Sequence, residues 1–343
     1  MVGYEETLTD PSYYGQIITQ SYPLVGNYGI NGEDAESGRI WAFGYIVREL
    51  CDAPSNFRCK KTLDQYLKEQ NIIGLAGIDT RSLVRLLRES GVMNGAITTE
   101  FDPDAEPEKK AALLPEIAAY AVVDAVKAVT CREAVTYEPT AAGAWGDTPL
   151  HVALLDLGCK NNIVRCLQKR GCRVTVLPGT TTAAELAALN PDGLMLSNGP
   201  GDPAENVEII ANIREMLSTG IPTFGICLGH QLTALAAGAK TCKLKYGHRG
   251  ANQPVTSPAK QRTFITSQNH GYAVMADTLP ESVGQMSYFN ANDGTCEGVD
   301  YLKWNCFTVQ FHPEANGGPK DTEFLFDQFV SRMLAAKGVI NNA

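Results

Sequence analysis

The rhythm of hydrophobic and polar positions changes along the chain and divides the sequence into two halves. From residue 150 onward, short apolar runs alternate with amphipathic stretches. The apolar runs predict buried strands and the amphipathic stretches predict helices, a succession typical of a parallel sheet covered on both faces. The predicted strands are 151–156, 173–177, 193–196 and the apolar run 221–224 that leads to Cys227. The predicted helices are 161–170, 182–189, 207–217 and 231–237.

The first half follows another pattern and predicts a smaller α+β domain. Turn signals separate short β-rich runs in residues 1–50, so we expect strands and loops there, with strands within 16–19 and 40–47. Leucines on one side of the chain predict helices, the second of which has a cap at Asp79 and Thr80 and ends at Gly91. The expected helices are 63–70, 81–89 and 107–128.

The boundary between the two halves is expected at residues 136–149. This stretch is poor in large apolar residues and rich in Ala, Gly, Pro and Thr, which is typical of an interdomain linker. The sequence therefore predicts domains at 1–135 and 150–343.

Composition and charge argue against a nucleic-acid-binding surface, a membrane span and a metal site. The net charge is −9 and no run of Lys or Arg exceeds two residues, which argues against a nucleic-acid surface. The N-terminus is acidic without an apolar signal core, and no apolar stretch is long enough to span a bilayer, so a cytoplasmic protein without a membrane partner is expected. Ten scattered cysteines form no C-x-x-C motif and no metal-ligand spacing with the five histidines, which predicts reduced thiols and no metal.

The main candidate for chemistry is Cys227, which stands between Gly225 and Gly229 in a G-x-C-x-G frame. A strand–turn–helix elbow of this kind holds a nucleophile in a strained backbone position, and the two glycines let strand and helix pack closely around it. Free N–H groups at the helix N-terminus favour a thiolate over a thiol. A buried cysteine in an ordinary turn is the alternative, because nine other cysteines suggest no such role.

Two further segments follow predicted strands in the same half. Residues 197–203, here called the glycine loop, are rich in glycine and proline. These residues would hold the loop in one conformation, with its backbone N–H groups facing a ligand. An ordinary βα loop is the alternative. Segment 308–314 is an apolar strand that ends in His312 and Glu314, which alternation places on one side of the chain. The carboxylate can then orient the imidazole as in a catalytic triad, whereas a surface histidine and a solvated or capping glutamate are the alternatives.

At these residues the sequence resembles the class I (triad) glutamine amidotransferases, through GICLGHQ and FHPEANGGP. GYEETLTDPSY, SNFRCKKTLDQYL and GIDTRSLVRLLRESG narrow the resemblance to the small-subunit family of carbamoyl-phosphate synthase, and LSNGPGDP, KYGHRGANQPV and SQNHGYAV match it too. The resemblance covers essentially the whole chain. It implies an α/β fold, with a mostly parallel, flavodoxin-like amidotransferase domain preceded by a smaller α+β domain that docks a partner. Family members carry further residues before the GY segment, which implies that this chain lacks the first strands of that domain.

The resemblance also implies roles for single residues. Cys227 would be the nucleophile, His312 the general base and acid, and Glu314 the residue that orients it. Residues implied to hold glutamine are Ser12, Gly199, Gly201, Leu228, Gln231, Asn269, Gly271 and Tyr272, the last at a position that is often Phe in the family. The alternative is a turn role for Ser12, Asn269 and Tyr272 and a helix-surface position for Gln231. His230 and His270 are expected to support the structure, and segment 245–254 has no assigned chemistry.

The implied reaction is hydrolysis of glutamine to glutamate and ammonia through a γ-glutamyl thioester, with the N–H groups of Leu228 and Gly199 stabilising the oxyanion. No cofactor is expected in this chain. ATP, magnesium and bicarbonate are expected on a large subunit that receives the ammonia in a heterodimer, and a higher oligomer of heterodimers is left open. The product would serve arginine and pyrimidine biosynthesis.

Two other functions are open at this point. An amidotransferase could serve another synthase, such as that of anthranilate or GMP, but those partners would not need the N-terminal half. A non-catalytic binding or regulatory protein could keep the fold, but Cys227, His312 and Glu314 are all intact.

Overall fold

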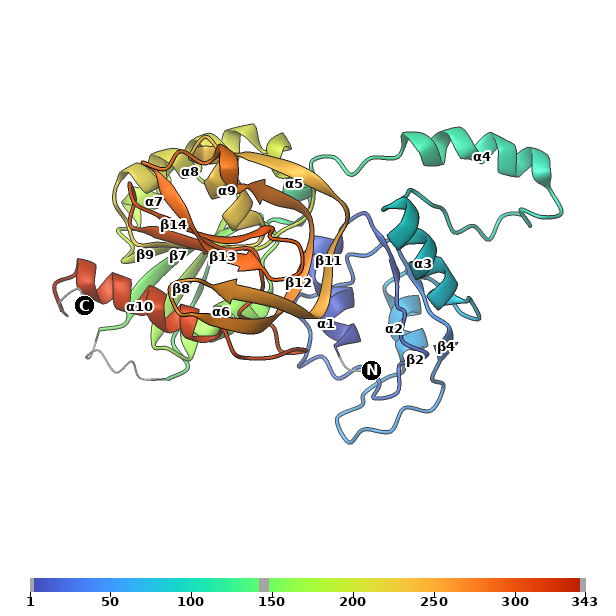
Figure 1. Cartoon of the computed structure of the whole chain (residues 1–343). Coiled ribbons are helices and arrows are strands. Elements are labelled where there is room, and N and C mark those ends of the chain that lie inside the picture. The colour runs from blue at the N-terminus through green and yellow to red at the C-terminus, as the bar shows by residue number, and fades with distance from the viewer. Residues whose placement is uncertain (1–2, 142–147, 340–343) are drawn as a thin grey trace. The chain divides into compact units, whose positions relative to one another are not determined.

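The computed structural model describes residues 3–141 and 148–339 (Figure 1). The chain forms two compact units, Met1–Val123 and Asp124–Ala343. This division comes earlier than the predicted boundary at 136–149, because helix α5 (Ala125–Val129) buries Val126 in the core of the second unit and strand β6 (Val135–Tyr137) joins its sheet. Residues 142–147 of the predicted linker lie outside the described residues.

The first unit is an α+β structure, as predicted. Strands β1, β3 and β5 form a parallel sheet in the order β1-β3-β5, and β2 pairs with β4. Its core is built around Tyr4, Tyr45 and Leu63. The elements are α1 (Tyr4–Thr9), the 3-10 turn η1 (Pro11–Tyr13), β1 (Ile17–Thr19), β2 (Leu24–Val25), β3 (Gly44–Ile46), β4 (Glu49–Leu50), α2 (Leu63–Glu69), β5 (Ile73–Leu75), α3 (Thr80–Ser90) and α4 (Pro107–Ala119).

Helix α1 was not predicted, since residues 1–50 were expected to form strands and loops. This short helix depends on distant residues. Tyr4 is fully buried, and the carboxylate of Glu5 accepts hydrogen bonds from the backbone N–H groups of Asn31 and Gly32 at 2.9 and 2.7 Å. Tertiary contacts stabilise it, and a local pattern of six residues does not contain them.

Helices α2 and α3 agree with the predicted helices 63–70 and 81–89, because local sequence signals define their ends. A capping box between Thr62 and Gln65 starts α2, Asp79 caps α3 by accepting from the N–H of Ser82, and Gly91 ends α3 with a φ of 95°. The predicted helix 107–128 is wrong as a continuous element. The chain becomes extended after α4, and a new helix, α5, begins after Asp124.

The second unit contains, in its described residues, a 10-stranded sheet in the order β12-β11-β13-β14-β15-β10-β9-β7-β8-β6. Its central strands β15, β10, β9, β7 and β8 are parallel, as predicted. The bounds are β7 (Leu150–Asp156), β8 (Cys172–Pro178), β9 (Gly193–Leu196), β10 (Thr223–Ile226), β11 (Lys240–Ser257), β12 (Arg262–Met275), β13 (Gly284–Asn290), β14 (Cys296–Tyr301) and β15 (Cys306–Val309). The helices are α6 (Asn161–Gln168), α7 (Ala183–Ala188), α8 (Val207–Ser218), α9 (Leu228–Ala236) and α10 (Phe324–Ala336), with the 3-10 turns η2 (Pro203–Glu205) and η3 (Ala276–Thr278).

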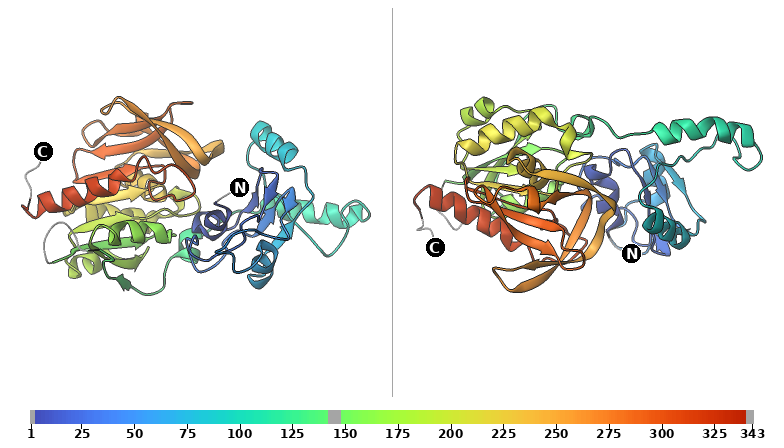
Figure 2. Two further views of the ribbon diagram at one scale, coloured as in Figure 1. Left: turned by 90° about the horizontal axis from the view of Figure 1, so that it is seen from below. Right: turned by 45° about the horizontal axis from the view of Figure 1, so that its top comes forward.

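Helices cover both faces of this sheet, which confirms the predicted layering (Figure 2). Along β7, Val152 and Leu154 pack in one core with residues of α6 and α10. Ala153 and Leu155 pack in a second core with residues of α8 and α9. The side chains of a strand alternate between faces, so a strand buried on both sides is apolar throughout.

The antiparallel strands β11 to β14 extend the sheet beyond the predicted part. No elements were predicted for them. Strand β11 pairs with β12 in a register that shifts between Lys243 and His248 and again between Gly250 and Gln253. Such irregularities interrupt the period-2 alternation by which a strand is recognised in a sequence.

Among the described residues, no helix combines the length and apolar character needed to cross a membrane.

Candidate active site

Cys227 lies at the turn between β10 and α9, where the sequence predicted a nucleophile elbow. Its φ of 53° and ψ of −103° are a strained combination for a residue with a side chain. A hydrogen bond of 2.9 Å from its N–H to the carbonyl of Val309 on β15 holds it in place. The side chain is 2% exposed. The predicted strained backbone is thereby confirmed.

The two flanking glycines are required by close packing. A Cβ atom on Gly225 would lie 2.9 Å from Cγ2 of Thr308, and one on Gly229 would lie 2.5 Å from the carbonyl oxygen of Leu196. Real Cβ atoms do not approach a backbone oxygen so closely. The G-x-C-x-G frame therefore lets α9 begin directly against β9 and β15.

His312 and Glu314 form the predicted pair, although they lie beyond the strand. Nδ1 of His312 is 2.7 Å from Oε1 of Glu314, and both residues are buried. The prediction of a strand through 308–314 is wrong, because β15 ends at Val309. Beyond it the chain bonds to other strands, as the N–H of His312 donates to the carbonyl of Ser267 on β12 at 2.9 Å.

The electrostatics of the pair favour a charged imidazole. Burial alone would lower the pKa of His312, but the negative charges of Glu314 and Cys227 raise that pKa above its ordinary value. Nε2 of His312 is buried and has no hydrogen-bond partner among the described residues. Since Nδ1 is committed to Glu314, Nε2 is the ring nitrogen that remains available to another group.

Lys160 is a charged neighbour of this pair that sequence reasoning missed. Its Nζ lies 3.3 Å from Oε1 of Glu314, with both side chains almost fully buried. Burial raises the pKa of the Glu314 carboxyl, but the positive charges of His312 and Lys160 outweigh it and hold the pKa below its usual range. The signal in the sequence was a lysine in the short loop that follows the predicted buried strand 151–156, because parallel strands end at the ligand-binding edge.

The glycine loop lies beside the start of α9, as the prediction of a shared edge requires. The carbonyl of Ser197 accepts a 3.0 Å hydrogen bond from the N–H of Gly229. A Cβ atom on Gly199 would lie 2.7 Å from Cδ2 of Leu228, so these two predicted oxyanion donors are neighbours. Gly201 has a φ of 89°, which favours glycine.

Three other predicted glutamine contacts of this unit lie on β12, and a fourth, Gln231, bonds to that strand from α9. Cys227 Sγ lies 3.9 Å from the backbone oxygen of Asn269. Nε2 of Gln231 donates to the carbonyl of Tyr272 at 2.8 Å, and Gln231 is buried, so the helix-surface alternative is wrong. Burial, a hydrogen bond to Asp202 and its charge raise the pKa of Tyr272 to about 12, which ties β12 to the glycine loop. Asn269, Gly271 and Tyr272 lie inside a strand, so the turn alternative is wrong for Asn269 and Tyr272.

Ser12 belongs to the first unit. It lies in η1, is buried, and its N–H donates to Oδ1 of Asp10 at 2.8 Å. Its part in glutamine binding stays a prediction.

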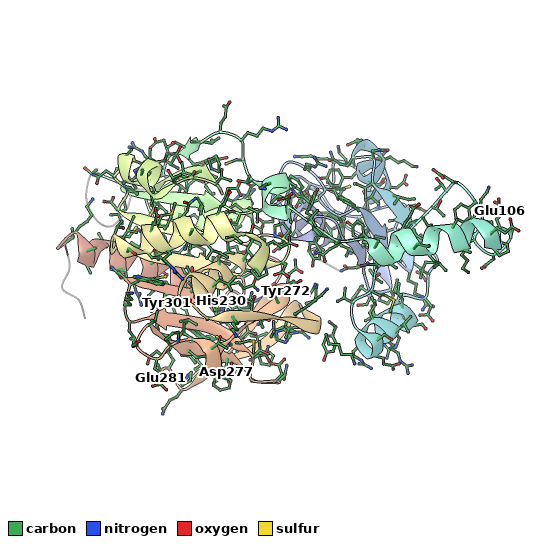
Figure 3. The ribbon with its side chains drawn as sticks, turned by 90° about the horizontal axis from the view of Figure 1, so that it is seen from above. Glu106, His230, Tyr272, Asp277, Glu281 and Tyr301 are labelled. Atoms are coloured by element: carbon green, nitrogen blue, oxygen red, sulfur yellow. The ribbon has the colours of Figure 1, made fainter. Side chains whose placement is uncertain are left out.

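Two buried histidines near the predicted triad, His230 and His270, make the internal hydrogen bonds that the expected supporting role requires. Nδ1 of His230 is 2.7 Å from Oγ1 of Thr308, and complete burial lowers the pKa of His230 to about 3 (Figure 3 labels this residue). Nδ1 of His270 is 2.7 Å from the carbonyl of Tyr272. Burial also holds the pKa of His270 well below its ordinary value, which favours the neutral ring.

Known families match both units. The family "Carbamoyl-phosphate synthase small chain, CPSase domain" matches residues 1–97, and "Glutamine amidotransferase class-I" matches residues 153–332. The carbamoyl phosphate synthase small chain of Syntrophotalea carbinolica is 48% identical over 344 residues, covering 97% of this chain and 89% of that protein. The protein of the same name from Chlorobaculum tepidum is 47% identical, with 98% and 90% covered.

The solved structures support the fold of the second unit. A putative GMP synthase protein from Thermoplasma acidophilum aligns with a TM-score of 0.51 and 21% identity, covering 57% of this chain and 98% of that one. Both family matches, and the similarity to the curated relatives over nearly the whole chain, agree with the elbow, the His–Glu pair and the N-terminal motifs. The chain therefore belongs to the carbamoyl-phosphate synthase small chain family and carries a class-I glutamine amidotransferase domain.

Proposed function

We propose that the chain is a glutamine-hydrolysing enzyme subunit in which Cys227, His312 and Glu314 act as the catalytic triad. The observation that carries the proposal is the strained elbow at Cys227 together with a buried His312 whose Nδ1 is held by Glu314. A nucleophile, a base and a residue that orients the base are the parts that acyl transfer requires.

The reaction begins when the thiolate of Cys227 attacks the side-chain amide carbon of glutamine and its C=O electrons move onto oxygen. His312, protonated at Nε2, gives its proton to the leaving nitrogen, so ammonia departs and a γ-glutamyl thioester remains. His312 then takes a proton from water, which attacks the thioester. The C–S bond breaks, glutamate leaves, and the thiolate of Cys227 and the protonated ring of His312 are restored.

Family membership and the local geometry support a proposed set of substrate-binding residues. The backbone N–H groups of Leu228 and Gly199 are proposed as oxyanion donors, and removing one such donor typically raises the barrier by ~2.7–4 kcal/mol. Gln231 would present its amide oxygen to the substrate, because its Nε2 already donates to the carbonyl of Tyr272 and to Oε1 of Gln310. Gly201, Asn269, Gly271, Tyr272 and Ser12 complete the proposed set.

The ammonia would pass to a large subunit, which would bind ATP, magnesium and bicarbonate and use them in carbamoyl phosphate synthesis. Family membership supports this partnership. The heterodimer, the cytoplasmic location and the roles in arginine and pyrimidine biosynthesis belong to the same proposal and rest on the same support.

The first unit is proposed to dock the large subunit. It contains no triad residue, and the family match that sets this chain apart from other amidotransferases covers residues 1–97. Large apolar side chains stand exposed on it, among them Phe57 at 96% and Phe43 at 51%. Aromatic side chains such as these are enriched at protein–protein interfaces.

The test is the Cys227→Ser variant, assembled with the large subunit. Glutamine-dependent synthesis should vanish, while synthesis from added ammonium should stay near the wild-type rate, because only ammonia release uses the thiol. The unmodified complex given both nitrogen sources is the control. Equal loss of both activities, or retained glutamine-dependent synthesis, would contradict the assignment.

A further inference from the structure

Three buried side chains from three strands converge close to the glutamine contacts. They are His248 on β11, His270 on β12 and Glu297 on β14, here called the histidine cluster. One ligand atom of each lies within 4.8 Å of those of the other two. His248 and His270 face each other as register partners across β11 and β12.

The hydrogen bonds of His270 leave one nitrogen facing an acceptor. Nδ1 lies 2.7 Å from the carbonyl oxygen of Tyr272, which can only accept, so Nδ1 carries the proton. Nε2 lies 3.0 Å from Oε1 of Gln268. In a neutral imidazole Nε2 has a lone pair, so two acceptors point at each other.

Turning the amide of Gln268 does not remove the conflict. Its Nε2 donates to Oγ1 of Thr266 at 3.2 Å and to Oε2 of Glu297 at 2.9 Å. Thr266 already donates its own proton to the carbonyl of Gln253. A turned amide would therefore place its oxygen against two other acceptors, so the orientation with Oε1 toward His270 is the better one.

His248 repeats this arrangement. Its Nε2 lies 2.8 Å from Oδ2 of Asp293, so the ring N–H on that side donates to a carboxylate. Nδ1 is buried and, among the described residues, finds no partner with hydrogen-bond geometry, although Oε1 of Glu297 lies only 3.3 Å away. When Nδ1 of His248 is deprotonated, lone pairs of two imidazoles, an amide and a carboxylate converge here without a positive charge between them.

We propose that His248, His270 and Glu297 bind one divalent transition-metal ion, Zn²⁺ by ligand preference, with Oε1 of Gln268 as an additional oxygen ligand. Two imidazoles with a carboxylate are a common Zn²⁺ donor set. The separations of 3.0 and 3.3 Å are near the ~3.4 Å between neighbouring ligands of a tetrahedral ion with bonds of about 2.1 Å. Rotations of the side chains would shorten the longer separations between ligand atoms, which are at most 4.8 Å.

The surroundings fit such a site. Metal-bound histidines usually donate their second N–H to a carboxylate or a backbone carbonyl, which fixes the ring. Here Asp293 does so for His248 and the carbonyl of Tyr272 does so for His270. An ion at this place would tie three strands together beside Asn269, so its role would be structural and would reach the glutamine contacts through β12.

The sequence predicted no metal in this chain, because the ligands are spread over 50 residues without a recognisable spacing. Strand pairing alone unites them. The rival explanation is a proton on one of the facing atoms, which would satisfy the same lone pairs without any metal.

The experiment uses the full chain, stripped with a chelator and then dialysed against Zn²⁺ or Co²⁺. We expect one ion per chain and a rise in the melting temperature. The Co²⁺ form should show visible bands of a nitrogen and oxygen site and lack the near-ultraviolet thiolate band that any of the ten cysteines would add. Failure of the wild-type chain to take up an ion would overturn the proposal and favour the proton.

Two variants locate the site. Glu297→Gln, nearly the same shape, should weaken binding at least tenfold, while His151→Gln, which removes a histidine of β7, should bind like wild type. If Glu297→Gln fails to fold, anomalous diffraction of the metal-loaded wild-type chain decides the matter. A peak among His248, His270 and Glu297 supports the site, and a peak elsewhere, or equal binding by both variants, refutes it.

Discussion

Oε1 of Glu314 lies 2.7 Å from Nδ1 of His312 and 3.3 Å from Nζ of Lys160. One buried carboxylate oxygen thus meets two cationic groups. The arrangement keeps the carboxylate ionised and fixes the ring, so that Nε2 of His312 is the nitrogen that remains for chemistry. The charge of Glu314 is therefore shared between orienting the base and balancing a buried lysine.

His312→Asn should lower glutamine turnover more than Glu314→Gln does, by at least tenfold. An imidazole without its carboxylate can still move protons, whereas asparagine cannot, and in other triads the base is worth more than the acid that orients it. Steady-state glutaminase kinetics of both variants in the complex provide the measurement. The reverse order would show that the roles of the two residues are assigned wrongly.

His230 should make the fold sensitive to acid. Its pKa is lowered to about 3 by burial, against an ordinary value near 6.5, so between these values the unfolded chain binds a proton that the folded chain does not. Stability contributed by the neutral ring is complete above about pH 6.5 and declines as pH falls, by about 1.4 kcal/mol per pH unit. Denaturant unfolding of wild type and His230→Gln from pH 7 to 5 should show the steeper decline in wild type. Parallel curves would mean that His230 does not resist protonation.

Gly229→Ala should damage both stability and activity. The new methyl group would lie 2.5 Å from the carbonyl oxygen of Leu196, so α9 would have to move, at a cost of roughly 1–3 kcal/mol. Since Cys227 caps this helix, glutaminase activity should fall more than tenfold. Gly38→Ala, where a Cβ meets no atom within 4 Å, is the control and should change neither. Unchanged melting and turnover in Gly229→Ala would contradict the packing argument.

The boundary at Val123 predicts which fragment folds. Residues 124–343 should unfold cooperatively by themselves, whereas residues 150–343 should be less stable by about 3–6 kcal/mol, because they lack the buried side chains of Val126 and Val129. The loss of β6 should add to this difference. Thermal unfolding of both fragments gives the comparison, and Val126→Ala in the longer one should fall between them. Equal midpoints would place the boundary where the sequence first suggested it.

The sequence by itself determined the features that depend on neighbouring residues. The frame around Cys227 encodes the turn, since two glycines and an apolar run suffice to define a strand, an elbow and a helix. The pair of His312 and Glu314 was predictable for the same reason. The single proline between them restricts the backbone, so the two side chains are expected on the same side of the chain. The apolar runs of the central strands specified a sheet buried on both faces.

Only the tertiary structure decided what depends on residues far apart in the chain. Helix α1 needs backbone donors from Asn31 and Gly32, and Lys160 reaches Glu314 across 154 positions of sequence. The histidine cluster exists through the pairing of β11, β12 and β14, whose bulges obscure the alternation of their side chains. Contacts of this kind arise from the packing of whole elements, and a local pattern of residues carries no record of which distant partner a side chain will meet.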